Sequence, residues 1–345
     1  MARYERALTH APEACAAARV DLLDWHQHKP TAPRATTRTM SPQLGLVCIT
    51  QSKEVRYRIL TRKRLLDLSP EGRRKLLDEI FRDNIHAFDT ALRYCEREGI
   101  ALYRIPSSIF PFADEDVGRD VLQPLAGALA RSGQRAIAKN IRLVMHPDQF
   151  VVLSSDSPEV VANSIKILQM HADIMDMLQQ PRSPWALLEI HGGKSDRADA
   201  LVERIAALPE AIRLRIGLEN DEYAYSAAQI HDICMRSGVP MVFDAHHHIV
   251  HERLDSYDEP SVALMLAKAR ATWPDPSQQL VHISNGRSAF NDRQHADLID
   301  VMPSCYAAAP YIEIEAKAKE AAIDKLRAWQ AGVAGGAMPT SVQRP

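Results

Sequence analysis

Short apolar segments alternate with longer amphipathic segments along most of the chain, from residue 43 to about residue 330. Each apolar segment has the length of one β-strand, and most are nearly continuous runs of aliphatic side chains. Such runs are typical of strands that are covered on both faces in a parallel sheet. The pattern predicts strands at 43–50, 101–106, 141–146, 185–191, 214–220, 239–245, 279–284 and 310–316.

Helical patterns with recognisable ends separate these strands. The clearest begins at Ser69, a capping residue followed by Pro70 at the first helical position, and it stops at Gly99. Glycine at that place is typical of a left-handed helix terminator. Further helices are predicted at 117–132, 158–178, 198–208, 226–237, 259–271 and 317–330.

Eight strand–helix units in about 290 residues predict a single α/β domain, a (β/α)8 TIM barrel, rather than a doubly wound sheet. We expect residues 41–330 to form this barrel. Residues 1–40 are predicted to be a partly flexible N-terminal extension and residues 331–345 a flexible C-terminal tail, because both are rich in small and polar residues. In such a barrel the chemistry gathers at the carboxyl ends of the strands.

Composition and charge narrow the class of protein. The 345 residues are 46% hydrophobic and 25% charged, which is typical of a globular protein with a substantial core. The formal net charge of −2 argues against a globally basic nucleic-acid binder but allows a local basic patch. No apolar run approaches the roughly 18 residues of a membrane span, so we expect no membrane association. Five scattered cysteines without a CxxC motif argue against a disulfide framework and favour the cytoplasm.

Histidine and acidic residues recur where six consecutive predicted strands end. A single such residue is most often a loop or capping side chain, but the recurrence at one end of a barrel predicts a shared metal site. The residues are His146, Glu189, His191, Glu219, Asp244, His246, His247, His248, His282, Glu313 and Glu315, with His295 in the segment after the seventh strand.

Imidazoles mixed with carboxylates suit Zn²⁺, Mn²⁺ or Fe²⁺ rather than Mg²⁺ or Ca²⁺. Buried carboxylates would repel one another without a compensating cation, and the set exceeds what one tetrahedral ion uses. We therefore expect two or three divalent metals, with Mn²⁺ favoured, Zn²⁺ as the alternative and Glu219 as a bridging ligand. Clustered metals are suited to the hydrolysis of a phosphodiester.

Several segments carry a resemblance to a known family. They are YRIPSS (103–108), MHPDQF (145–150), LLEIHGG (187–193), GLEND (217–221), VFDAHHH (242–248), VHIS (281–284), HAD (295–297) and IEAK (314–317). In this order they resemble the ultraviolet-damage endonucleases, which are TIM barrels related to endonuclease IV. The resemblance implies a metal-dependent DNA repair endonuclease. Such an enzyme incises damaged double-stranded DNA on the 5′ side of ultraviolet photoproducts, by attack of a metal-activated hydroxide on the phosphodiester.

The resemblance also implies a set of metal ligands. One metal would be held by His146, His191 and Glu219, and a second would share Glu219 and add Asp244, His282 and Glu315. A third would use His247 and His295. Within these sets, the resemblance implies that the catalytic residues are Glu219, Glu315 and His247.

Lesion recognition would depend on residues outside the metal centre. Gln149 matches the family's damage-probing glutamine, and Phe150 stands where a tyrosine is usual, so that stacking is kept and a hydroxyl is lost. The family's tyrosine and asparagine probes fall at Leu46 and Thr50. The family's modified lysine, two residues before His282, is replaced by Leu280.

A basic segment at 53–64, KEVRYRILTRKR, has six basic side chains in twelve positions directly after the first predicted strand. Its simplest interpretation is a solvated loop, but its place at the active face of a barrel favours contacts with DNA phosphates. The side chains expected to bind DNA are therefore Gln149, Phe150, Arg56, Arg58, Arg62, Lys63, Arg64 and, at the end of the second strand, Arg104.

Two other functions compete with the nuclease. A xylose-isomerase-like sugar isomerase or epimerase has the same kind of barrel, with acidic residues and histidines around one or two divalent metals. A damage-binding protein without catalysis is a further alternative. The Gln149–Phe150 pair and the basic segment favour the nuclease over the sugar enzyme, because a sugar substrate needs neither. We expect a monomer, since a barrel of this size can read a duplex alone.

Overall fold

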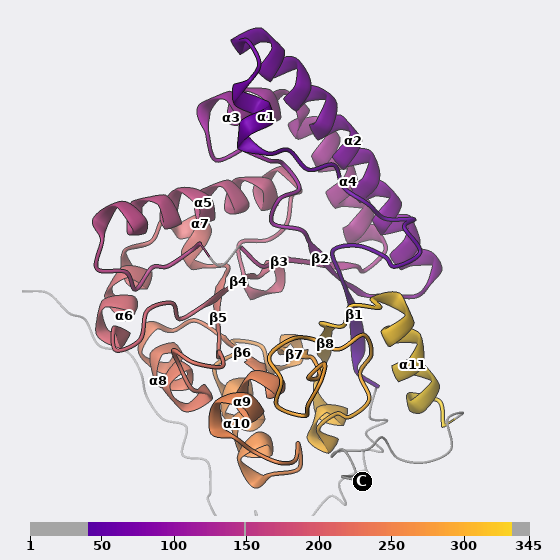
Figure 1. Ribbon diagram of the computed structural model, residues 1–345, viewed down its shortest axis with the longest axis vertical. Helices are drawn as coiled ribbons and strands as arrows, with labels where there is room; N and C mark the ends of the chain where they lie inside the picture. Colours follow the sequence, from indigo (N-terminus) through magenta and orange to yellow (C-terminus); the bar gives the residue numbers. More distant parts are fainter. Residues whose placement is uncertain (1–40, 148–149, 333–345) are drawn as a thin grey trace, which may run out of the picture. The chain divides into compact units, whose positions relative to one another are not determined.

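The computed structural model of the chain describes residues 41–147 and 150–332. Eight parallel strands close into a barrel in the order of the sequence, with helices outside them (Figure 1). The strands are β1 (Gln43–Val47), β2 (Leu102–Ile105), β3 (Arg142–Met145), β4 (Leu188–His191), β5 (Ile216–Glu219), β6 (Met241–Asp244), β7 (Leu280–Ile283) and β8 (Tyr311–Ile314). Each lies within its predicted range, so the predicted (β/α)8 barrel is confirmed.

The helices follow the prediction with a few differences. They are α1 (Arg62–Leu66), α2 (Pro70–Arg97), α3 (Asp116–Leu122), α4 (Ala126–Ala138), α5 (Pro158–Met177), α6 (Ala198–Ala207), α7 (Glu210–Arg213), α8 (Ala227–Ser237), α9 (Ala245–Glu252), α10 (Pro260–Ala271) and α11 (Glu320–Gln330). The single helix predicted at 117–132 is wrong. A 3₁₀ turn at Gln123–Leu125 separates α3 from α4, because Pro124 has no backbone N–H for an α-helical hydrogen bond.

Local sequence explains the long helix α2. The Ser69 hydroxyl accepts a hydrogen bond from the Gly72 backbone N–H at 3.2 Å, and Pro70 occupies the first turn. Gly99 follows the helix with φ +63, the left-handed conformation that a glycine adopts without a steric penalty. The predicted cap and terminator of this helix are therefore confirmed.

The interior of the barrel is layered because alternate strand residues point inward. Arg142, at the start of β3, is fully buried at the amino ends of the strands. A small apolar cluster follows, in which Leu280 packs with Leu102, Val144, Leu187 and Val242. The position of the family's modified lysine is thus part of an apolar layer here. The strand register then sets Glu219 beside His191, and His282 beside both Asp244 and Glu313.

Two predictions concern the whole chain, namely the absence of a membrane span and the division into an extension, a barrel and a tail. Within residues 41–147 and 150–332, no helix is long and apolar enough to cross a membrane. The predicted N-terminal extension lies outside the described residues, as does residue 333 onwards of the predicted tail. The proposed domain boundaries therefore stay predictions.

Candidate metal centre at the carboxyl ends of the strands

The carboxylate of Glu219 lies at the end of β5, fully buried among four imidazoles. Its Oε2 atom is 3.0 Å from His146 Nε2 and 3.6 Å from His191 Nε2. Its Oε1 atom is 2.9 Å from His282 Nδ1 and 3.3 Å from His247 Nδ1. Each oxygen therefore faces two ring nitrogens, which is the arrangement expected of a carboxylate that bridges two metal ions.

Helix α9 begins directly after Asp244, and its geometry directs only one histidine of the run at 246–248 towards Glu219. Asp244 caps this helix, and its Oδ1 accepts a hydrogen bond from the His247 backbone N–H at 2.8 Å. Successive side chains on a helix diverge by about 100°, so three adjacent histidines cannot face one site. His247 points to Glu219, whereas His246 lies 2.9 Å from the Tyr257 hydroxyl and His248 contacts the hydroxyl of Ser261.

Four groups of three side chains bring ligand atoms within 4.8 Å of one another. They are His146–His191–Glu219, Glu219–Asp244–His247, Asp244–His282–Glu315 and Glu189–His282–Glu313. The first is the set predicted for one metal, and the third contains three of the four residues predicted for the second. Among the described residues, Asp244 Oδ2 and His191 Nδ1 are buried without a hydrogen-bond partner. The donor set and these unpartnered atoms fit divalent cations.

Electrostatics in the cluster are dominated by burial and by the neighbouring charges. Burial opposes ionisation of Glu219, but His282 and His191 outweigh it and hold the pKa of this carboxyl well below its usual range. Burial also opposes protonation of His247, but the negative charges of Asp244 and Glu219 raise the pKa of its imidazole to about 10. The carboxylates therefore hold positive charge at this end of the barrel, as a metal centre requires.

A second polar layer lies beneath the cluster. His282 Nε2 is 3.1 Å from Glu313 Oε2 and 3.3 Å from Glu189 Oε2, so the ring has carboxylates on both sides. Burial and the charge of Glu313 raise the pKa of Glu189, whose two oxygens have no hydrogen-bond partner among the described residues. Carboxylates behind a metal-binding histidine fix its ring orientation. The sequence placed Glu189 and Glu313 at strand ends but assigned neither a role.

Arg104 belongs to this layer, and its expected role needs correction. Its side chain is 8% exposed, its Nε donates to Glu313 Oε2 at 2.5 Å, and its guanidinium also pairs with Glu315. The predicted contact with a DNA phosphate does not agree with this position, because two carboxylates already occupy the guanidinium. Alternation along β2 points the side chain into the barrel, which its nearness to the strand end did not reveal.

Asn220 is a supporting residue that the sequence analysis missed. Its side chain donates to the Asp244 backbone oxygen at 2.9 Å and accepts from the Asp244 N–H at 3.0 Å. Its own backbone oxygen lies 2.9 Å from His247 Nδ1. Asn220 thereby fixes two candidate ligands at once. Its place directly after Glu219 in the GLEND segment was the available signal.

His295 is less closely tied to the centre than the other predicted ligands. Its Nδ1 lies 3.8 Å from Glu315 Oε2, and about a third of the side chain is exposed. It belongs to none of the four groups found among the described residues. The third metal, assigned to His247 and His295, therefore stays a prediction.

The predicted DNA-binding residues lie in different surroundings. Arg56, Lys63 and Arg64 are exposed and have no ion-pair partner within the described ranges. Arg58 pairs with Asp83 at 2.5 Å, and Arg62 pairs with Glu115. With Lys53, which is also exposed and unpaired among the described residues, the basic segment leaves four cations free for another anion.

The residues at the predicted lesion-probing positions differ sharply in exposure. Phe150 is 67% exposed, as a stacking residue requires, and Gln149 lies outside the described residues. Leu46 and Thr50 are 1% and 0% exposed, so neither can touch a ligand at the surface. The Thr50 hydroxyl instead accepts a hydrogen bond from the Val55 N–H at 2.9 Å.

Two pockets flank the cluster. One of about 450 Å³ includes Arg104, His295 and Glu315, and one of about 290 Å³ includes His191 and Glu222. These are hollows in which a substrate would meet the candidate ligands.

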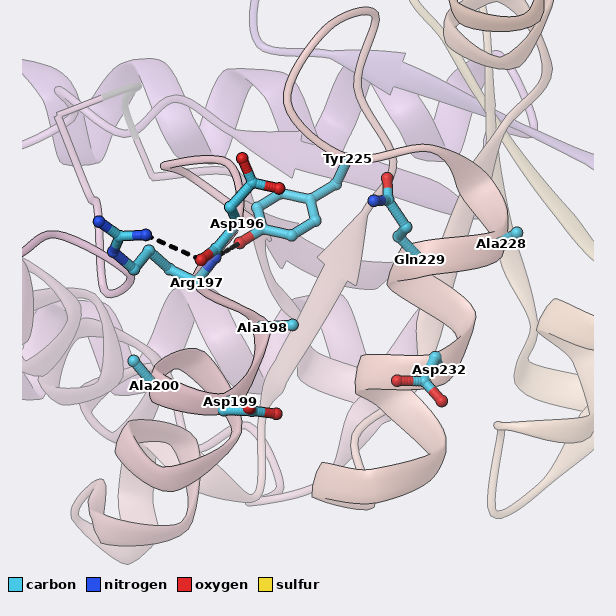
Figure 2. Close-up of a pocket in the computed structure, with 9 residues that line it drawn as sticks. All are labelled: Asp196, Arg197, Ala198, Asp199, Ala200, Tyr225, Ala228, Gln229 and Asp232. Carbon is cyan, nitrogen blue, oxygen red and sulfur yellow. Dashed lines mark hydrogen bonds between the residues drawn. The ribbon is translucent and has the colours of Figure 1, made fainter.

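A further pocket, of about 640 Å³, lies between α6 and α8 (Figure 2). Its carboxylates Asp199 and Asp232 pair with Arg236, and none of its lining residues belongs to a candidate ligand group. We therefore place the functional site at the mouth of the barrel rather than here.

Comparison with known proteins finds relatives of this chain. A model of the UV-endonuclease UvdE family matches residues 42–334. The crystal structure of SacUVDE is similar with a TM-score of 0.70 and 24% identity, covering 83% of this chain and 98% of that one. Endonuclease IV from Thermus thermophilus is similar with a TM-score of 0.53 and 14% identity, covering 86% of this chain and 100% of that one. At these identities the two structures bear on the fold alone.

Two curated relatives are similar in sequence over most of their length. The UV DNA damage endonuclease of Nostoc sp. strain PCC 7120 is 53% identical over 294 residues, which are 85% of this chain and 91% of the relative. The UV DNA damage endonuclease of Deinococcus radiodurans is 48% identical over 289 residues, which are 83% and 95% of the two chains. Together with the family match over residues 42–334, these relatives establish that the chain belongs to the UV-endonuclease UvdE family.

Proposed function

We propose that this chain is a metal-dependent DNA repair endonuclease that incises damaged double-stranded DNA on the 5′ side of ultraviolet photoproducts. The observation that carries the proposal is the Glu219 carboxylate, with two imidazoles at each oxygen. A centre of this kind is suited to a phosphodiester, because the charge that develops on its oxygens must be stabilised on both the attacking and the leaving side.

The residues of the centre divide the work of holding two metal ions. His146 and His191 would hold one ion, Asp244 and Glu315 would hold the other together with His282, and Glu219 would bridge them. When bound, such ions lower the pKa of water and stabilise phosphoryl oxygens. Asn220 keeps Asp244 and His247 in place through hydrogen bonds of 2.9 to 3.0 Å. We infer Mn²⁺ as the resident metal from the mixed ligand chemistry, with Zn²⁺ as the alternative.

Contacts with the damaged duplex would come from loops around the mouth. Phe150 is exposed and can stack on a base, and Gln149 precedes it in the chain. Arg56, Lys63 and Arg64 are free of ion pairs among the described residues and can reach phosphates. Such contacts make binding dependent on salt but not on base sequence. We further propose that the enzyme acts as a monomer in the cytoplasm.

The decisive experiment is incision of a labelled duplex with one pyrimidine dimer, with Mn²⁺ present, beside an abasic-site duplex and an undamaged duplex. We expect cleavage directly 5′ of the dimer. Cleavage of the abasic-site duplex alone would contradict the proposed lesion class. Failure to cleave any duplex, in protein that contains metal, would favour the sugar isomerase alternative and would be followed by aldose isomerisation assays.

Two histidine variants make the experiment specific. His191→Ala removes a candidate ligand, whereas His231→Ala removes an imidazole from the outer helix α8, which contributes to none of the ligand groups. We expect the first variant to lose both metal and incision, and the second to keep both. If both variants lost metal and incision equally, the loss would reflect impaired folding rather than the removal of a metal ligand.

A further inference from the structure

A cationic pocket lies beside the metal centre, at the junction of β1, β2 and β8. Its volume is about 450 Å³, and its lining includes Arg104, His295, Glu315, Lys317 and Lys319. Two of these residues, His295 and Glu315, are candidate metal ligands. A group bound in this pocket would therefore lie next to a group bound at the metals.

Two cations of this pocket lack a partner among the described residues, the exposed Lys317 and the less exposed Lys319. Arg104 is occupied by Glu313 and Glu315, whereas no ion pair or hydrogen bond engages the Lys319 ammonium among the described residues. The side chain is only partly exposed, and burial lowers the pKa of its ammonium. A partly buried, unpaired ammonium is costly unless an anion joins it.

The backbone at Lys319 is strained and firmly held. Its φ and ψ are +48 and −114, a conformation that residues with a side chain rarely adopt. Two hydrogen bonds hold the preceding loop, from Lys317 N to the Ala296 oxygen at 3.1 Å and from Ala318 N to the Asp297 oxygen at 2.9 Å. Strain of this kind persists where the surroundings impose it and is concentrated at functional sites. The loop therefore presents Lys319 at a defined place.

We propose that this pocket binds a backbone phosphate of the DNA next to the phosphate that is cut, with the Lys319 ammonium as its cationic contact. The inference rests on the proposed nuclease function. A phosphate fits the site because lysine acts on it as a point charge, without the paired geometry that arginine requires. The carboxylate of Glu315 is shielded by Arg104, so that it does not repel the anion as a free carboxylate would.

Neighbouring charges extend the pocket towards the rest of the DNA-binding surface. Lys317 is exposed and also lines the pocket, and the positive charge of Arg56 is among the causes that lower the pKa of the Lys319 ammonium. Arg56 is the first arginine of the basic segment, which follows β1. A strand of DNA bound at Lys319 would therefore have a second basic residue, Arg56, in its neighbourhood.

Binding without metal tests the proposal separately from catalysis. A dimer-containing duplex is titrated with wild type, Lys319→Ala, Lys319→Arg and Lys268→Ala in EDTA, over a range of salt concentrations. Lys268 is a matched control, because it is an exposed lysine in the last turn of α10. Loss of one phosphate contact is expected to reduce the slope of log K against log salt by about 1 in Lys319→Ala. Lys319→Arg and Lys268→Ala should keep the wild-type slope.

A glycine variant separates a binding role from a structural one. Lys319→Gly relieves the positive φ, so its Tm should stay unchanged or rise while its salt slope falls as in Lys319→Ala. A wild-type slope in both variants would overturn the proposal. A slope that falls only together with the Tm would also overturn it, because the lysine would then be structural. Failure of the proposed function looks different, since wild type itself would then show no preference for the damaged duplex and no incision.

Discussion

The two ends of the barrel interior hold buried charge in opposite ways. At the amino ends of the strands, Arg142 donates to the backbone oxygens of Trp185, Gln278 and Pro184, each at 2.8 Å. Its guanidinium also lies 4.9 Å from the ring centroid of Tyr311 and 5.1 Å from that of Trp185. Every nitrogen of this cation has a partner within the protein.

At the carboxyl ends of the strands, in contrast, several buried polar atoms lack a partner. Within the described residues, Asp244 Oδ2, His191 Nδ1, Glu313 Oε1 and both oxygens of Glu189 are buried without a hydrogen bond. An unpartnered buried polar atom costs roughly 1–3 kcal/mol, so a cluster of them is hard to maintain for stability alone. The fully paired Arg142 stabilises the fold. The unpartnered atoms at the carboxyl ends of the strands are instead placed to contact a bound metal or substrate.

The largest effect is expected at the centre of the mouth. Glu219→Gln keeps the shape of the side chain but removes the charge between two pairs of imidazoles, so bound metal should fall. Single-turnover incision should drop by about 10³ or more, which is about 4 kcal/mol. Glu203→Gln is the matched control and should keep metal and incision, because Glu203 is an exposed glutamate on α6 that belongs to none of the candidate ligand groups. Full incision by Glu219→Gln would refute the bridging role.

The second largest effect is expected at the amino ends of the strands. A substitution there should reduce stability but leave metal binding unchanged. Arg142→Met takes the donor away from three partly buried backbone oxygens, which should lower the free energy of unfolding by about 3 kcal/mol. Metal content and the rise of Tm on metal addition should be unchanged. Denaturant titration measures the first quantity, with the exposed Arg131→Met as control. A loss of metal in Arg142→Met would mean that the two ends of the barrel are coupled.

Metal withdrawal tests the same contrast without a mutation. A metal at 100 times its Kd should stabilise the folded chain by about 2.7 kcal/mol, and EDTA should remove that gain. Arg142→Met should keep the gain and Glu219→Gln should lose most of it. Thermal unfolding with and without Mn²⁺ gives all three values. Equal gains in the three proteins would show that the metal binds outside the proposed centre.

The sequence predicted the barrel well but predicted the details of the candidate site only in part. All eight strands were predictable, because a buried parallel strand is a short apolar run, and most members of the candidate ligand groups were picked out by their place at strand ends. The choice of His247 from three adjacent histidines depends on the helix that starts at Ala245, which the apolar pattern did not indicate. The burial of Arg104 depends on the face of β2 that it occupies. Lys319 was not predicted to bind DNA, because its backbone conformation arises only in the folded loop.

The smallest effect that we predict separates the two carboxylates beneath the centre. Glu313 lies 3.1 Å from His282 Nε2 and is ionised beside Arg104, so Glu313→Gln should weaken metal affinity tenfold to a hundredfold, as is typical of a lost supporting carboxylate. Burial and the charge of Glu313 raise the pKa of Glu189, so this carboxyl holds its negative charge less firmly than Glu313 does. Glu189→Gln should therefore change metal affinity less. Metal titration of both variants makes the comparison. Equal losses would mean that both carboxylates beneath His282 contribute equally to the metal centre.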